Sequence, residues 1–545
     1  MSEMSKLQIR ANVLSILSKI RTDKNFNSDV LSNYVSYLSD IDDKKAMFDV
    51  IIKELLKMSD DEVAFCSCLI KELVPKEYVE ESVFEVLKSS SYSDEAKYKL
   101  VQMLRIVGFS NAFNDIPQYF DNPQGMLDLD TEKMLERASF NPETMLDFLD
   151  FIYAVSDNDK AILLSSLKED YNGDNLANLI YPILYSEFSN KIKKQVVEIL
   201  ADTKSSLSLS PMEYLLKVTD NKELLSSIEF AVKKLKFAGA TQEKANLFYA
   251  DIVKEHKPYE CYATVVDGAG NQALLISRLN KDNNVNFIAI VINDSTGIVD
   301  CFGFYNISQN ETKRVISKFN QSEGKYKVSE NYIKTKLNQA ANTTIKNKSV
   351  FPYEFICWST LLTDLKPLSF SIDEFVSNLD FSFDFKNEDV TNVLSKEYSY
   401  RWFINYNENS VLKELVEEIY NIDDIEIDKV NSILINYIDK IFDEKICNIW
   451  ENRIKDLIYL LKENIKNNDY FIFLKMLKND DLFYLFKQII LQRSIFNNIL
   501  LLRENVKTSI LPTNIFKKKT VNEEKYSIQK IDKIVSVLKK SWINE

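Results

Sequence analysis

Apolar residues recur at helical spacing over most of the chain. In residues 7–249 they follow the i, i+3, i+4, i+7 pattern of amphipathic helices, and short polar stretches separate one segment from the next. Such a succession of short helices, without strands between them, is typical of antiparallel helix pairs stacked side by side. The pattern therefore predicts an α-solenoid rather than a closed bundle.

Capping motifs mark two of the predicted helix starts. Ser59-Asp60-Asp61-Glu62 and Ser210-Pro211-Met212-Glu213 have the spacing of a capping box, in which Ser and Glu side chains satisfy free backbone N–H groups. The second motif also places a proline at the first helical position, where no N–H is needed. These motifs predict helices that begin at Asp60 and Pro211.

Residues 259–306 have a different pattern, which predicts β-strands. Side chains at 259–266 alternate with a period of two, and residues 287–292 are apolar on both faces. A strand with two apolar faces must be covered on both sides, so we expect residues 286–293 in the middle of a small sheet between helices. Turn-forming residues predict hairpins and hence an antiparallel β-meander; they lie at 267–271, 282–284 and 293–297.

The first of these turns has an alternative interpretation as a nucleotide site. Gly268, Gly270 and Ala273 form a G-x-G-x-x-A pattern after a strand-like run, and Asp294 follows at about the ribose-binding distance. Against this interpretation, Asp267 would place a carboxylate beside the pyrophosphate, and no further βαβ units follow. A hairpin is therefore the favoured prediction, with a nucleotide-binding or enzymatic module as the alternative.

The chain beyond the sheet again predicts helices. Residues 308–319, 328–343 and 353–365 have helical patterns, and residues 369–389 change composition to phenylalanines among acidic residues. Longer helices follow from residue 390, which favours a separate helical bundle. We thus predict a mainly α protein with three domains: a HEAT-like α-solenoid at 1–255, a small α/β module at 256–368 and a C-terminal helical domain at 369–545.

This order of elements resembles a group of uncharacterised bacterial HEAT-like proteins. The resemblance covers residues 7–368 and rests on the helix pairs together with VDGAGNQ at 266–272, NDSTGIVDCFG at 293–303 and PYEFICW at 352–358. It implies protein–protein scaffolding. It implies no catalytic residues.

Amino-acid composition and charge limit the classes of partner and the cellular compartment that we expect. The 545 residues are 45% hydrophobic and 27% charged, and the net charge of −13 disfavours general binding to nucleic acid or anionic membranes. The six cysteines are scattered, the N-terminal sequence lacks the apolar core of a signal peptide, and no apolar run is long enough to span a membrane. We therefore expect a cytoplasmic protein without disulfides.

Candidate catalytic residues are few. The single histidine, His256, stands between charged residues before a proline, where a surface position is expected, so histidine-based catalysis is nearly excluded. Cys301 is flanked by Asp300, whose charge would raise rather than lower the thiol pKa. The spacing of Cys66 and Cys68 would point their thiols apart on a helix.

Carboxylates at the turns could in principle meet. Asp267, Asp294 and Asp300 could share a divalent cation or an acid–base role, but such turn residues usually bond to nearby backbone. We predict no catalytic residue, no cofactor and no metal site, with Gly268, Gly270 and Asp294 as cofactor-binding residues in the alternative alone.

The C-terminal end is the most basic part of the chain. Tyr526 and Trp542 lie among its lysines and could stack on bases, which leaves nucleic-acid binding as a second alternative; the lysines are Lys517, Lys518, Lys519, Lys525, Lys530, Lys533, Lys539 and Lys540. A solvated helix face explains the same pattern, so nucleic acid is not the expected partner. The leading hypothesis is a non-enzymatic adaptor that binds another protein through its solenoid surface.

Overall fold

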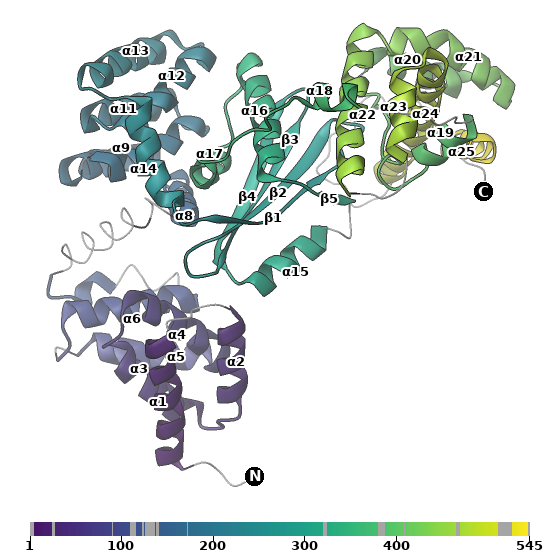
Figure 1. The fold of residues 1–545 in the computed structure, drawn as a ribbon. Coiled ribbons are helices and arrows are strands. Elements are labelled where there is room, and N and C mark those ends of the chain that lie inside the picture. The colour runs from purple at the N-terminus through teal and green to yellow at the C-terminus, as the bar shows by residue number, and fades with distance from the viewer. Residues whose placement is uncertain are drawn as a thin grey trace.

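The computed structural model confirms a mainly helical chain around a small central sheet (Figure 1). It describes residues 5–23, 28–89, 91–108, 116–122, 125, 137, 141–171, 173–319, 324–379, 387–407, 409–464, 469–510 and 526–542. Within these ranges, none of the helices combines the length and apolar composition needed to cross a membrane.

The first helices form a hydrophobic core of their own. Val13, Phe48, Leu69 and Leu104 are among the buried residues of this core. Figure 1 shows these helices in purple, below the rest of the chain. They are α1 (Lys6–Asp23), α2 (Ser28–Ser39), α3 (Lys44–Leu55), α4 (Asp60–Leu73), α5 (Lys76–Leu87) and α6 (Asp94–Val107), followed by the short 3-10 helix η1 (Ile116–Tyr119).

A second helical core follows in residues 142–253. Helices α9, α11 and α13 lie one above the other (Figure 1), and Leu176, Ile192, Leu215 and Ile228 are among the buried residues of this core. The elements are α8 (Pro142–Ala154), α9 (Asp157–Asp170), α10 (Gly173–Ile180), η2 (Tyr181–Tyr185), α11 (Asn190–Thr203), η3 (Ser206–Ser208), α12 (Leu209–Val218), α13 (Lys222–Phe237) and α14 (Gln242–Val253).

The predicted antiparallel meander is confirmed. The five-stranded sheet has the order β4-β3-β2-β1-β5, so strand β3, which contains the doubly apolar run, lies inside the sheet as expected. Strand β5 was not predicted, because its three residues are too few to show a period. The strands are β1 (Lys257–Thr264), β2 (Asn271–Leu279), β3 (Val285–Asn293), β4 (Gly297–Ile307) and β5 (Lys325–Lys327).

Helices cover both faces of the sheet, as a doubly apolar strand requires. On one face Ile276, Ile288 and Ile290 share a core with Trp358. On the other face, Leu275 and Phe287 pack with Ile316 of α15. The covering elements are α15 (Gln309–Phe319), α16 (Glu330–Lys346), α17 (Tyr353–Ser359), η4 (Thr360–Leu362) and α18 (Ile372–Ser377).

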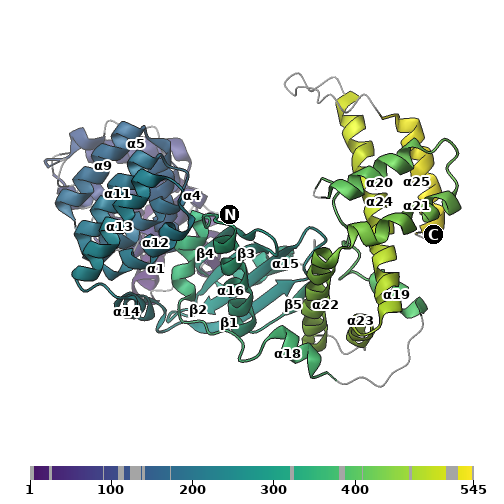
Figure 2. The same ribbon diagram turned by 90° about the horizontal axis from the view of Figure 1, so that it is seen from above.

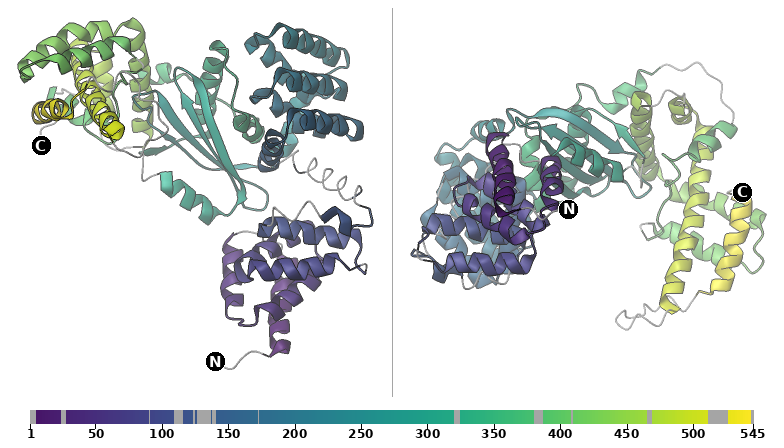
Figure 3. Two further views of the ribbon diagram at one scale, coloured as in Figure 1. Left: turned by 180° about the vertical axis from the view of Figure 1, so that it is seen from behind. Right: turned by 90° about the horizontal axis from the view of Figure 1, so that it is seen from below.

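The C-terminal helices lie on the opposite side of the sheet from α8–α14, as the views in Figures 1, 2 and 3 agree. Their buried residues, such as Trp450, Ile454 and Phe486, belong to the same hydrophobic core as one sheet face. The helices are α19 (Asn387–Leu394), α20 (Ser410–Asn421), α21 (Ile427–Ile441), α22 (Glu444–Asn464), α23 (Asp469–Leu477), α24 (Asp480–Ile510) and α25 (Ile528–Trp542).

Candidate functional site

The glycine turn predicted from the sequence is a hairpin between β1 and β2. Asn271–Leu279 is a strand that pairs antiparallel with β1, so the helix that a dinucleotide fingerprint requires does not follow Gly270. Gly270 has a φ of +89°, a backbone conformation that side chains with a Cβ rarely adopt. The hairpin prediction is confirmed, and the turn lacks the strand–turn–helix geometry of a dinucleotide fingerprint.

The C-terminal segment fills the space beside Gly268. A Cβ at this position would lie 2.1 Å from the backbone oxygen of Phe403, so glycine is needed for close approach. The indole N–H of Trp402 donates to the Val266 carbonyl at 2.8 Å. The turn is therefore packed against the C-terminal segment at Gly268.

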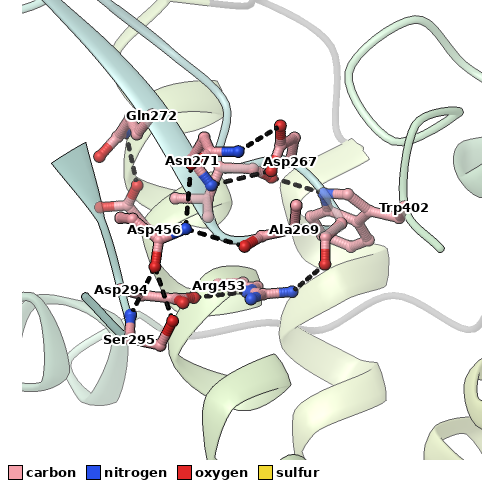
Figure 4. Close-up of polar contacts among 12 residues, drawn as sticks. Asp267, Ala269, Asn271, Gln272, Asp294, Ser295, Trp402, Arg453 and Asp456 are labelled. Carbon is pink, nitrogen blue, oxygen red and sulfur yellow. Dashed lines mark hydrogen bonds and ion pairs between the residues drawn. The ribbon is translucent and has the colours of Figure 1, made fainter. Parts of the chain in front are cut away.

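Arg453 of α22 joins two hairpin turns, as Figure 4 shows. Its Nε lies 2.6 Å from Oδ2 of Asp294, and its Nη1 donates to the Gly268 carbonyl at 2.9 Å. The side chain of Arg453 is 9% exposed and also lies over the Trp450 ring. Thus Gly268, Gly270 and Asp294 do come together, but around an arginine of the same chain.

A buried hydrogen-bond network lies next to this pair. Asp456 accepts from the Tyr332 hydroxyl at 2.9 Å, from Gln272 Nε2 at 3.0 Å and from the Lys336 ammonium at 3.1 Å. Burial, and then the Asp456 charge, raises the pKa of Tyr332 well above its ordinary value, so the phenol stays protonated and donates. These four side chains connect β2, α16 and α22.

We call this region the polar junction: Gly268, Gly270, Gln272, Asp294, Tyr332, Lys336, Arg453 and Asp456. A cavity of about 280 Å³ lies beside it. The charged side chains that line the cavity are paired within the chain: Lys336 with Asp456, Arg453 with Asp294, and Lys455 with Asp373. This arrangement ties the sheet to the C-terminal helices.

The other turn carboxylates do not meet. Asp267 accepts from the Asn271 backbone N–H at 2.8 Å, and Asp300 accepts from the Cys301 N–H at 2.8 Å. Within the described ranges, no cluster of His, Cys, Asp and Glu could hold a metal ion. Burial, and then Asp300, raises the pKa of the Cys301 thiol well above its ordinary value, as the flanking carboxylate led us to expect.

His256 is half-buried, so its predicted surface position is wrong. Its Nε2 lies 3.2 Å from Nδ2 of Asn286 on β3, because the segment that enters β1 lies against the neighbouring strands. Burial, and then the charge of Arg278, lowers the pKa of the imidazole, which favours its neutral form.

Part of the basic C-terminal end can be located. Helix α25 carries Lys530, which lies over the Tyr420 ring, and the indole N–H of Trp542 donates to Asn431 at 3.1 Å. Tyr526 packs edge-on against Tyr420. The two aromatic residues considered for base stacking are therefore used in contacts among the C-terminal helices. Lys517, Lys518, Lys519 and Lys525 lie outside the described residues.

A second candidate site, which was not predicted from the sequence, is a cleft of about 780 Å³ between α8, η2 and the segment that joins α16 to α17. We call it the aromatic cleft, and Val299 of the edge strand β4 also lines it. Its ring-bearing wall residues are Tyr153, Tyr185, Phe351 and Tyr353. The helical period gives no signal for this site, because segments more than a hundred residues apart form it.

The rings of the aromatic cleft support one another. Tyr214 stacks on Phe351 with centroids 4.7 Å apart and on Tyr185 at 5.6 Å, and its hydroxyl donates to the Ser349 carbonyl at 2.5 Å. Tyr153, with a relative exposure of 62%, contacts Phe188 at 5.7 Å. The cleft thus has a fixed inner wall and an exposed tyrosine at its rim.

Carboxylates at the rim make this cleft different from the polar junction. Asp150 and Glu187 are exposed lining residues, and neither forms an ion pair within 4 Å with any described residue. Lys193 is the cationic lining residue; burial lowers its pKa, and the charge of Glu187 opposes that shift. The rim therefore carries more negative than positive charge.

Comparisons of the chain with protein-family models, with curated proteins and with solved structures find no match. The resemblance to HEAT-like proteins therefore stays a prediction from the sequence.

Proposed function

We propose that the protein is a non-enzymatic adaptor that binds another protein through the surface of helices α8–α14. The observation that supports this most directly is a pair of phenylalanines on the outer face of α13. Phe230 and Phe237 lie seven residues apart, so they share one face of the helix, and their relative exposures are 70% and 97%. Large apolar side chains exposed together are typical of interaction surfaces.

The same helices favour a scaffold architecture. Helices α9, α11 and α13 lie in one layer, and α13 ends that layer (Figure 1). The last unit of an α-solenoid normally presents a polar outer face, because it has no further neighbour to cover it. We therefore regard residues 142–253 as part of a HEAT-like solenoid whose last unit is left open for a partner.

The cytoplasm is the setting that we propose for this binding. All six cysteines are free thiols, as a reducing compartment permits. The net charge of −13 favours a protein partner with positive charge over nucleic acid.

The test is capture of partners from cells of the native host with three forms of the full chain. Phe230→Ser combined with Phe237→Ser removes the exposed face, whereas Ile435→Ser removes an exposed apolar residue of α21 as the matched control. Quantitative mass spectrometry should find proteins that the unchanged chain and the control retain and that the double variant loses. Equal recovery by all three forms would contradict the role of α13.

A further inference from the structure

The aromatic cleft combines ring faces with unpaired carboxylates. Tyr153, Phe351 and Tyr353 line it, and Asp150 and Glu187 lie at its rim without ion-pair partners among the described residues. Ring faces attract cations through the electron density above the ring, and a desolvated cation gains most from this contact. A carboxylate nearby adds a charge-assisted hydrogen bond.

The charge around the cleft has one predominant sign. Glu143, Asp147 and Asp150 follow one side of α8 at i, i+4 and i+7. Burial raises the pKa of the Glu143 and Asp147 carboxyls. A hydrogen bond from the Tyr305 N–H opposes the pKa shift of Glu143, and a neighbouring carboxylate raises each pKa further. Of these three carboxylates Asp150 lines the cleft, so a cation there would relieve the repulsion between Asp150 and Asp147. Lys193 supplies a single positive charge on the other side; the charge of Glu187 raises its pKa, but the two side chains form no ion pair within 4 Å.

We infer that the aromatic cleft binds an arginine side chain presented by a partner protein; this inference rests on the adaptor function proposed above. A guanidinium is planar, so it stacks on a tyrosine or phenylalanine ring while its N–H groups donate to carboxylates at the edge of that ring. Tyr153 at the rim is 62% exposed, so an arginine side chain of another protein can reach its ring.

Two small probes test the charge requirement with the full chain. N-acetyl-L-arginine amide carries the guanidinium, and N-acetyl-L-citrulline amide has nearly the same shape without the charge. Ligand-observed NMR titrations should show saturable binding of the arginine probe and at least about tenfold weaker binding of the citrulline probe. Higher salt concentration should weaken the binding of the arginine probe. Equal binding of the two probes, or no binding of either, would overturn the inference.

Variants then locate the binding. Asp150→Asn and Glu187→Gln keep the size of the rim side chains and remove their charges, and Glu243→Gln removes an exposed carboxylate on α14 as the control. Each rim variant should bind the arginine probe at least about threefold more weakly, and the control should bind it as the unchanged chain does. Tyr153→Ala should also weaken binding, since it removes a ring face. Unchanged affinity in all three cleft variants would place the binding elsewhere.

The two proposals can fail separately. If the arginine probe binds but no partner depends on Phe230 and Phe237, the cleft inference holds and the adaptor proposal loses its main support. If partners depend on these phenylalanines but remain bound to a chain with both rim variants, the adaptor stands and the arginine inference is wrong.

Discussion

The polar junction and the aromatic cleft, which are both lined in part by residues of the central sheet and its turns, use charge in opposite ways. At the junction, Arg453 pairs with Asp294, and Asp456 accepts three hydrogen bonds, all within the chain. At the cleft, Asp150 and Glu187 form no ion pair among the described residues. Both regions bring together side chains from distant parts of the sequence.

This difference in charge pairing distinguishes a region that stabilises the fold from a region that we propose binds a ligand. A buried ion is costly to leave without a partner, so a network whose members satisfy one another holds elements in place. A carboxylate that remains unpaired beside exposed rings costs little while water solvates it, and it stays available for a ligand. Four predictions test this contrast, from the largest expected effect to the smallest.

The largest effect is expected from Arg453→Ala. This change leaves the Asp294 carboxylate and the Gly268 carbonyl without their main donor, and breaking a pair whose arginine is 9% and whose carboxylate is 30% exposed costs about 3 kcal/mol. Urea unfolding of the full chain should measure a loss of this size. Lys455→Ala breaks the more exposed pair with Asp373 and should cost less than about 1 kcal/mol. Similar losses of unfolding free energy in the two variants would show that the Arg453–Asp294 pair contributes no more than an ordinary surface ion pair.

Gly270→Ala should have the next largest effect. Its φ of +89° is unfavourable for alanine, and the new Cβ would lie 2.2 Å from Oδ1 of Asp294 and 2.8 Å from Nη2 of Arg453. We expect a loss of about 2–3 kcal/mol, with contributions from backbone strain and displacement of the ion pair.

Gly173→Ala provides the matched control for Gly270→Ala. Gly173 also has a positive φ, of +75°, but a Cβ there would meet nothing within 4 Å. Its cost should be that of the backbone alone, about 1 kcal/mol. Equal costs at both glycines, measured by urea unfolding, would show that the junction tolerates the added methyl group.

The local parts of this structure could be predicted from the sequence. Alternation of side chains and turn residues gave the hairpins, because strand faces and positive φ values depend on nearby residues. The capping box at Ser59 is present, and helix α4 begins at Asp60 as predicted. The start predicted at Pro211 is wrong, since α12 begins at Leu209, directly after the turn of η3. There, a preceding 3-10 turn replaced the side-chain cap.

Long-range contacts could not be predicted in this way. The need for glycine at position 268 comes from Phe403, and Asp294 takes its role from Arg453 on α22. The cleft likewise depends on Phe351 lying against Tyr214 of α12. No periodicity or spacing links such residues, so the sequence identified Gly268, Gly270 and Asp294 as unusual without showing what they contact.

A Tyr→Phe change in each region should give a smaller difference in the free energy of unfolding. Tyr332→Phe removes a buried hydroxyl that donates to Asp456 and accepts from Gln272, so we expect a loss of about 1–3 kcal/mol. Tyr153→Phe removes an exposed hydroxyl at the cleft and should change stability by less than about 0.5 kcal/mol. Urea midpoints at a common pH would compare them. A large loss from the second change would reveal an internal role for the cleft rim.

The smallest effect concerns Asp150→Asn and its dependence on pH. Burial, and then the Asp150 charge, raises the pKa of Asp147 above its ordinary value of 3.8. An acid whose pKa is higher in the folded chain loses folded stability as the pH rises through that range, because the folded state must release a proton that it holds more tightly. Removal of the Asp150 charge should therefore stabilise the fold slightly at pH 7, by up to about 0.5 kcal/mol.

This gain should shrink as the pH falls through the raised pKa of Asp147 towards 3.8, since the protonated carboxyl no longer responds to its neighbour. Thermal unfolding of the unchanged chain, Asp150→Asn and the control Glu243→Gln at a series of pH values would measure it. The control should show no such trend, because Glu243 is not among the groups that shift the pKa of Asp147. If Asp150→Asn instead destabilised the chain by more than about 1 kcal/mol at pH 7, Asp150 would have an internal partner, as the carboxylates of the polar junction do.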